Sequence, residues 1–346
     1  RVINASLAAV EGLICRCPVN KSACDQAAVR LVLDVMQEYS GDRCFENFDV
    51  CGVVVRSCLL LIRAFLSRDD NGVTEVFEYD KYVEAGGVPV QGDTDPSVAQ
   101  AKKDQFFAKK EAARRGEVVE DASPIVEESE GLKKLKEIVE CGGILRMVDC
   151  ARYHAADPRT ALFFLQTLHV LQYNHATSWW PLDGLSSSPD IVNLVLSFLV
   201  SFRDNPVIMW WCLTNLTLMC ERGDEPIASI EAWGKGGADD EGSIDEYAEV
   251  KEEDESISGG KVDGCSLLAK GMSEHLGNVH LQEQYCRLTL KMSKSLEGRM
   301  GLLRAGCFDI FEEAKVELAK GGGGAPPGFS RLCMNAQLAL ETGQTY

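Results

Sequence analysis

Histidine is the side chain most often used for acid–base chemistry and for zinc binding near neutral pH. His275 and His280 are five residues apart, so they do not share a helix face in the i, i+4 manner of a zinc motif. His169 lies inside the apolar run 162–171 and is predicted to be a core or groove residue. No segment resembles Gly-x-Ser-x-Gly, His-Glu-x-x-His or a P-loop, so the sequence predicts no catalytic residue and no enzyme activity. The full set of histidines is His154, His169, His175, His275 and His280.

Cysteine is the other residue type that could carry chemistry, and the chain has 14 of them. No Cys-x-x-Cys occurs, and Cys15, Cys17 and Cys24 have no histidine in metal-ligand spacing, so neither a metal nor a cofactor is predicted. A disulfide framework suits short secreted chains, and this chain is far too long to need one. Most of the cysteines lie in apolar, helix-like runs. They are therefore predicted to be reduced thiols that pack as small hydrophobes, in an intracellular compartment or an organelle interior.

Composition limits the classes of protein that the chain can belong to. Its 346 residues are 45% hydrophobic and 25% charged, which is ordinary for a globular protein and corresponds to about two domains or one elongated unit. With 53 acidic and 35 basic residues the formal charge is -18, which disfavours nucleic-acid binding. The longest apolar stretches, 191–200 and 206–220, are shorter than the roughly 18 residues of a membrane span.

Helix signals are abundant and strand signals are scarce. Three helices are predicted to begin at a capping residue followed by proline, at Asp157-Pro158, Ser188-Pro189 and Asn205-Pro206. The runs that follow are apolar nearly all round, so each helix must be covered on several sides by other helices. The pattern predicts an all-α fold.

A short segment recurs along the chain. Val83-Glu-Ala-Gly-Gly-Val88 is repeated as Val139-Glu-Cys-Gly-Gly-Ile144 and more loosely as Leu303-Arg-Ala-Gly-Cys-Phe308. In each copy an apolar helix end meets a glycine, which predicts a left-handed glycine that turns the chain into the next helix. Cysteines within the expected helices recur as well. When the length of the acidic insertion is subtracted from their spacing, the repeat length is in the mid-forties of residues, within the range of helical repeats.

These motifs resemble the armadillo repeat. The segment Leu281-Gln-Glu-Gln-Tyr-Cys286, followed by 294–299 and Leu302-Leu-Arg-Ala-Gly306, is similar to the family's repeat, and Glu84–Val88 and Glu140–Ile144 fit its inter-repeat turn. Asn205 to Leu216 fits the third helix of a repeat. The resemblance covers about two thirds of the chain and implies a right-handed α-solenoid of armadillo-like repeats. HEAT-type and other α-solenoids remain alternatives.

The resemblance also suggests a candidate binding site on one helix. Trp211 and Asn215 are four residues apart and share a helix face, with Trp210 alongside. They are similar to the Trp-x-x-x-Asn pair with which some armadillo proteins hold an extended peptide, because an amide offers both a donor and an acceptor to an unpaired strand. In the preceding repeat the corresponding segment Phe163–Thr167 has no asparagine. The alternative is that the tryptophans pack in the core and Asn215 satisfies a neighbouring turn.

Two charged insertions interrupt the repeats. The first carries basic side chains on an expected exposed helix. The second is acidic and rich in glycine, and its residues lack the register of a calcium-binding loop. It is expected to be a flexible surface loop that can attract a basic partner. The basic residues are Lys102, Lys103, Lys109, Lys110, Arg114 and Arg115; the acidic ones are Asp239, Asp240, Glu241, Asp245, Glu246, Glu249, Glu252, Glu253, Asp254 and Glu255.

The expected organisation has six parts. Residues 1–88 form N-terminal helical repeats, 89–131 the charged insertion, 132–233 central armadillo-like repeats, 234–264 the acidic loop, 265–320 a C-terminal repeat, and 321–346 a linker and capping helix.

The predicted function is a non-catalytic protein interaction scaffold or a structural subunit of a larger hetero-complex. The partners would be other proteins, including basic segments near the acidic loop, with no nucleic acid and no membrane span. The alternative is a transport or chaperone adaptor that captures peptides in a concave groove; a helical enzyme would need a polar pocket with convergent titratable groups.

The expected location is cytoplasmic or cytoskeletal. An organelle interior fits if a leader has been removed, because the sequence starts with Arg1 and is expected to be a processed or truncated piece.

Overall fold

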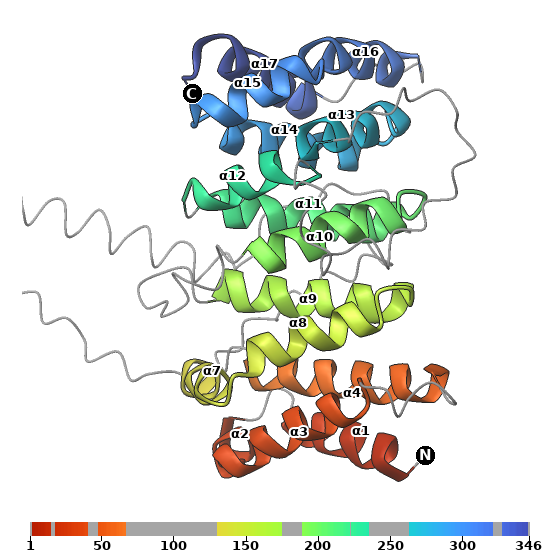
Figure 1. Cartoon of the computed structure of the whole chain (residues 1–346), viewed down its shortest axis with the longest axis vertical. Helices are drawn as coiled ribbons and strands as arrows, with labels where there is room; N and C mark the ends of the chain where they lie inside the picture. Colours follow the sequence, from red (N-terminus) through yellow and green to blue (C-terminus); the bar gives the residue numbers. More distant parts are fainter. Residues whose placement is uncertain are drawn as a thin grey trace, which may run out of the picture.

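The structure is a computed structural model that describes residues 2–14, 18–40, 48–66, 130–174, 189–221, 223–234, 263–320 and 327–344. All the regular structure in these ranges is α-helical, as expected. The helices follow one another from the N-terminal to the C-terminal end along the long axis of the molecule (Figure 1). Within the same ranges, no helix combines the length and apolarity needed to cross a membrane. Both charged insertions, apart from a few residues at their margins, lie outside the described residues.

The five longest helices of the described ranges, together with α1, form one continuous row in which each helix contacts the next. We call this the central row. It contains α1 (Val2–Ile14), α4 (Phe48–Leu66), α9 (Pro158–Asn174), α11 (Pro206–Cys220), α14 (Val279–Met292) and α17 (Pro327–Thr342).

A second row lies beside the central row, and each of its helices packs against the next one along the chain. Its members also contact the central-row helix that follows them in sequence. The second row contains α3 (Gln26–Glu38), α8 (Gly143–Tyr153), α10 (Pro189–Ser201), α13 (Gly264–Glu274) and α16 (Cys307–Ala319).

Shorter helices complete the layers. Four of the five layers in the described ranges begin with a helix of 6 to 11 residues, followed by a member of the second row and then a member of the central row. The short helices are α2 (Pro18–Ala23), α7 (Glu130–Glu140), α12 (Glu225–Ala232) and α15 (Leu296–Arg304).

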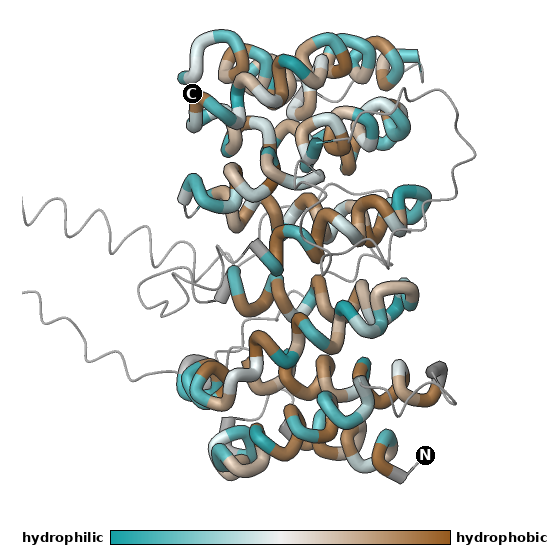
Figure 2. The backbone as a smooth tube through the Cα atoms, in the orientation of Figure 1, coloured by the Kyte–Doolittle hydropathy of each residue, from teal (hydrophilic) through white to brown (hydrophobic). Residues whose placement is uncertain are grey.

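The layers share one connected hydrophobic core, and hydrophobic residues recur in the helices from one end to the other (Figure 2). The helix α11 is the clearest example, since ten of its 15 residues are buried. It contacts α9, α10, α12 and α14. The expectation that this apolar helix must be covered on several sides is therefore confirmed.

The predicted helix starts are also confirmed, because α9, α10 and α11 begin at Pro158, Pro189 and Pro206. Asn205 caps α11: its side-chain oxygen accepts hydrogen bonds from the backbone N–H groups of Val207 at 3.1 Å and Ile208 at 3.3 Å. These two groups have no partner inside the helix, so the asparagine fixes where α11 begins.

Two of the three predicted glycine turns lie in the described residues, and both are left-handed. Gly142 separates α7 from α8 with a φ of 65°, and Gly306 separates α15 from α16 with a φ of 79°. The third copy, at 83–88, lies outside the described residues. The recurring segment therefore marks the same turn in two layers, between the short helix and the second-row helix.

Replacing Gly306 with alanine should lower the free energy of unfolding by about 1 kcal/mol, because a Cβ is unfavourable at this φ. An added Cβ meets nothing within 4 Å, so the loss would come from the backbone alone. Gly277→Ala is the matched control, since it too has open space and has no positive φ. Urea titration of both variants measures the difference; equal losses would contradict the turn assignment.

Candidate functional site

The predicted binding residue Asn215 lies in the interior between α11 and α9. Its side chain is fully buried. The amide nitrogen donates to the carbonyl oxygens of Trp211, at 2.8 Å, and Leu165, at 3.0 Å, and the amide oxygen accepts from Nε2 of Gln172 at 3.1 Å. The donors and the acceptor of the amide are thus engaged within the chain. This placement favours the alternative interpretation, in which Asn215 joins two helices instead of holding a peptide.

Thr167 makes a similar connection one layer earlier. It is buried on α9, and its hydroxyl lies 2.8 Å from the carbonyl oxygen of Phe163 and 3.4 Å from that of Leu59 on α4. Phe163–Thr167 is the segment that corresponds to Trp211–Asn215 in the sequence comparison. Both positions therefore contribute a polar side chain that reaches the backbone of the preceding central-row helix.

Trp211 is buried and packs against a histidine. Its ring is 4% exposed and makes an edge-to-face contact with His169 of α9 at a centroid distance of 5.1 Å. Burial lowers the pKa of His169 to about 4, so its imidazole is neutral at physiological pH. The predicted core or groove role of His169 agrees with this position.

Trp210 is the one of the three predicted site residues that lies partly at the surface. It is half-buried and meets Trp211 edge-to-face at 4.9 Å. Val207, Thr214 and Leu218 are also half-buried and lie on the same side of α11, three or four residues apart. We call these four residues the α11 stripe.

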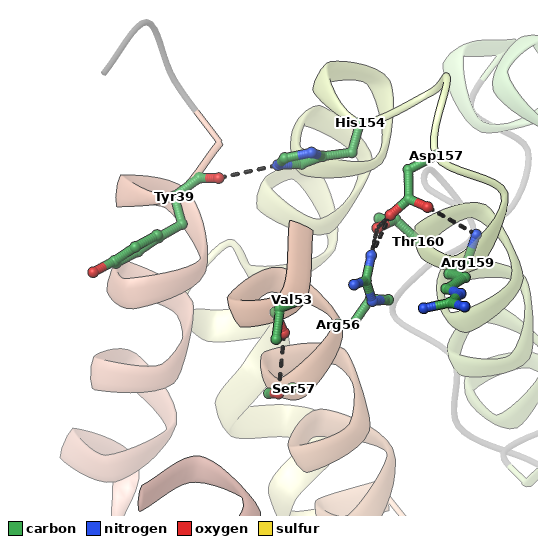
Figure 3. A network of polar contacts seen from close by, with 8 residues as sticks. All are labelled: Tyr39, Val53, Arg56, Ser57, His154, Asp157, Arg159 and Thr160. Carbon is green, nitrogen blue, oxygen red and sulfur yellow. Dashed lines mark hydrogen bonds and ion pairs between the residues drawn. The ribbon is translucent and has the colours of Figure 1, made fainter. Parts of the chain in front are cut away.

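A polar junction joins α4 to the start of α9 (Figure 3). Asp157 accepts hydrogen bonds from the Thr160 hydroxyl at 2.6 Å and the Arg159 backbone N–H at 3.1 Å, and it forms an ion pair with Arg56. Burial raises the pKa of Asp157, but these hydrogen bonds and the Arg56 charge outweigh it, so the net pKa is lowered. Gly52 leaves room for this contact, because a Cβ there would lie 3.3 Å from the carboxylate.

His154 forms the other part of the junction. Its Nε2 lies 3.0 Å from the carbonyl oxygen of Tyr39, the residue that follows α3 (Figure 3). Burial lowers the pKa of His154 more than the neighbouring carbonyl and Asp157 raise it. A neutral imidazole donating from Nε2 therefore joins the end of α8 to the end of α3, which is a positioning contact between layers.

The described cysteines behave as buried hydrophobes. Eleven of the 14 lie in the described ranges, none of these is in a disulfide, and nine are buried. Burial raises the pKa of Cys58 and Cys220 to about 12 and that of Cys150 to about 11, so these thiols are protonated and weakly nucleophilic. Across the described ranges, no three His, Cys, Asp or Glu side chains are arranged to hold a metal ion.

Comparison of the chain with models of protein families, with curated proteins and with solved structures found no match.

Two functional contacts were not anticipated from the sequence. Gln172 directly follows the apolar run 162–171 and has no sequence signal of its own, although it supplies the donor to Asn215. Arg56 lies inside the strongly apolar segment 48–66, and a charged residue there is a signal that a buried acidic partner exists. The sequence predicts Asp157 only as a helix cap. In the structure its side chain caps α9 and also forms the ion pair with Arg56.

Replacing Asn215 with alanine should lower the free energy of unfolding by about 2–4 kcal/mol, because the substitution leaves a buried cavity and removes one hydrogen bond each from Gln172 and Leu165. Thr214→Ala is the control, since the hydroxyl of Thr214 bonds only to the Trp210 carbonyl of its own helix. Its expected loss is below about 1 kcal/mol. Chemical denaturation measures both variants, and a small loss for Asn215→Ala would contradict the interior role.

Acid should destabilise the protein through His169. The unfolded histidine binds a proton below its ordinary pKa of 6.5, whereas the folded one resists protonation down to about 4, so stability falls as pH drops through this window. Between pH 7 and pH 5 the loss from this residue should be about 1–2 kcal/mol. His169→Gln should lose less stability over the same interval in pH-dependent urea titrations. Identical pH dependence in the two proteins would show that His169 titrates normally.

Proposed function

We propose that the protein is an armadillo-like, right-handed α-solenoid that acts as a protein interaction scaffold or as a structural subunit of a larger assembly. The observation that carries the proposal is the recurrence of layers in which a short helix, a second-row helix and a central-row helix follow one another. A layer of this kind cannot bury its apolar faces alone, and stacking on its neighbours buries them. The result is an extended surface made of equivalent positions on successive helices.

The recurring glycine turns support the same proposal. Gly142 and Gly306 occupy equivalent places in two layers, each between a short helix and a second-row helix. The motif similarity that suggested armadillo repeats falls on these turns. The recurring sequence segment and the left-handed turn thus mark the same place in these two layers.

The α11 stripe is the proposed contact surface. It lies on α11 of the central row, and it contains a half-buried tryptophan, Trp210. Tryptophan is enriched among residues that contribute most to binding, because it buries a large area with few rotatable bonds. The partners are proposed to be other proteins within a hetero-complex, and the charged insertions would add contacts.

The peptide-adaptor alternative gains no support from Asn215. In that mechanism the amide would have to bond to the backbone of a bound peptide, whereas it bonds to Trp211, Leu165 and Gln172. Opening it to a peptide would leave buried groups of α9 without their partners.

Replacing Trp210 with alanine tests the scaffold proposal. Partner proteins recovered with the native chain should be depleted at least tenfold in the variant, and circular dichroism verifies that the variant is folded. The matched control is Leu145→Ala, which removes an exposed apolar side chain from α8 instead. Quantitative mass spectrometry of affinity-purified tagged chains measures recovery.

Two results would count against this proposal. A native chain that recovers no stoichiometric partner contradicts the scaffold function. Equal recovery by the Trp210 and Leu145 variants places the contact surface away from the α11 stripe.

A further inference from the structure

The α11 stripe continues onto the two central-row helices beside α11. A capping residue precedes each helix, Asp157 before α9, Asn205 before α11 and Asn278 before α14, so their positions can be matched by counting from the cap. The matching positions are all half-buried or exposed, as in the stripe itself. We call the three sets together the α9–α14 face. Besides the α11 stripe it contains Arg159, Leu162, Gln166 and Val170 on α9, and His280, Glu283, Arg287 and Lys291 on α14.

Contacts between the helices show that the three sets lie side by side. Trp210 meets Trp211 edge-to-face, and the ring of Trp211 meets that of His169 on α9. On the other side of α11, Lys291 of α14 forms an ion pair at 2.5 Å with Glu221, the residue that follows α11. The surface is therefore continuous from α9 across α11 to α14.

The α9–α14 face is basic, although the chain as a whole is acidic. It carries Arg159, Arg287 and Lys291, whereas Glu283 is the one acidic residue within the three helices. The chain has a formal charge of -18, so its composition alone predicts more carboxylates than cations on any surface. A local excess of positive charge here is a property of these positions.

Two of these cations have no partner among the described residues. Arg159 is exposed and contributes only its backbone N–H to the contact with Asp157 (Figure 3). Arg287 is also exposed, and its guanidinium forms no ion pair or hydrogen bond in the described part of the chain, not even with Glu283 one turn away. A guanidinium presents its N–H donors in a planar fork that matches a carboxylate. Both arginines are thus available to carboxylates of another molecule.

We propose that the α9–α14 face binds an extended, acidic segment of a partner protein. Carboxylates of the segment pair with Arg159 and Arg287, and an apolar side chain between them packs on Trp210. The inference rests on the proposed scaffold function, because it names the chemistry of the partner that the α11 stripe contacts.

The spacing of the helices sets the length of the segment. Because α11 contacts both α9 and α14, Trp210 lies between the two arginines along the row. Packed helices are about 8–10 Å apart, so α9 and α14 are separated by about 16–20 Å. An extended chain rises about 3.3 Å per residue, so about six residues span this distance. The carboxylates are therefore expected about three residues before and after the apolar side chain.

The test measures fluorescence anisotropy of two labelled 12-residue peptides with the full chain at about 150 mM salt. Both peptides have a leucine in the middle, flanked three residues away on each side by glutamates in one and by lysines in the other. The glutamate peptide should bind at least tenfold more tightly. The net charge of the chain favours the lysine peptide, so the opposite preference requires a local basic surface.

Charge reversal locates the binding surface. Arg287→Glu and Arg159→Glu should each weaken binding of the glutamate peptide at least fivefold. The matched control is Arg30→Glu on α3 of the second row, which changes the charge of an exposed arginine equally and should bind as the native chain does. Circular dichroism verifies folding, and a glutamate in the first turn of α9 suits the helix dipole, so Arg159→Glu should stay folded.

Three results would overturn the proposal. The first is a lysine peptide that binds as tightly as the glutamate peptide, and the second is an Arg30→Glu chain that loses as much binding as Arg287→Glu. The third is a single-stranded oligothymidylate that binds more tightly than the glutamate peptide, which would assign the face to nucleic acid.

Recovery of partner proteins separates this inference from the proposed function. If the native chain recovers partners and the two arginine variants recover them equally, the acidic-segment inference fails while the scaffold function stands. If the native chain recovers none, the scaffold function itself is contradicted.

Discussion

The burial of the inner central-row helices, α4, α9, α11 and α14, each between two neighbours in the row, is the constraint on which the rest of the structure depends. A helix such as α11, with ten of 15 residues buried, loses water on nearly every side, and its apolar surface is stable only while α9 and α14 stay in place. Deep burial also restricts polar residues to positions where a partner exists. Thr167 and Asn215 meet this condition by reaching backbone carbonyls of the preceding helix. A polar side chain at this position specifies the offset between layers, which apolar packing alone fixes less strictly.

Charged groups link the layers at their margins, where water remains near. Arg56 pairs with Asp157 between α4 and the start of α9, Arg146 pairs with Asp34, and Lys291 pairs with Glu221. The latter two pairs are partly exposed, and such pairs contribute about 0–1 kcal/mol each. Arg56 and Asp157 are more enclosed, so breaking that pair would leave a charge in poor contact with water. Core packing therefore supplies most of the stability, while the ion pairs mainly fix how the helices of adjacent layers are aligned with one another.

The sequence predicted the local features well and the contacts between layers poorly, for a physical reason. Helix starts at Pro158, Pro189 and Pro206 and the turns at Gly142 and Gly306 depend on residues close in the chain, whose conformational preferences are strong. The partner of Asn215 depends on the offset between α9 and α11, which no local pattern encodes. The Trp211–Asn215 spacing correctly places both residues on one helix face. Whether that face meets solvent or another helix is decided by the packing of the whole stack.

The division between interior and surface also constrains where binding can evolve on such a stack. Interior polar groups such as Asn215 hold layers together, so altering them to create a binding site would disturb two helices at once. A half-buried position such as Thr214, whose hydroxyl bonds to a carbonyl oxygen of its own helix, can change with little effect on the neighbouring layers. On α11, substitutions at the buried positions therefore affect the packing of neighbouring helices, whereas substitutions at Thr214 affect mainly its own helix.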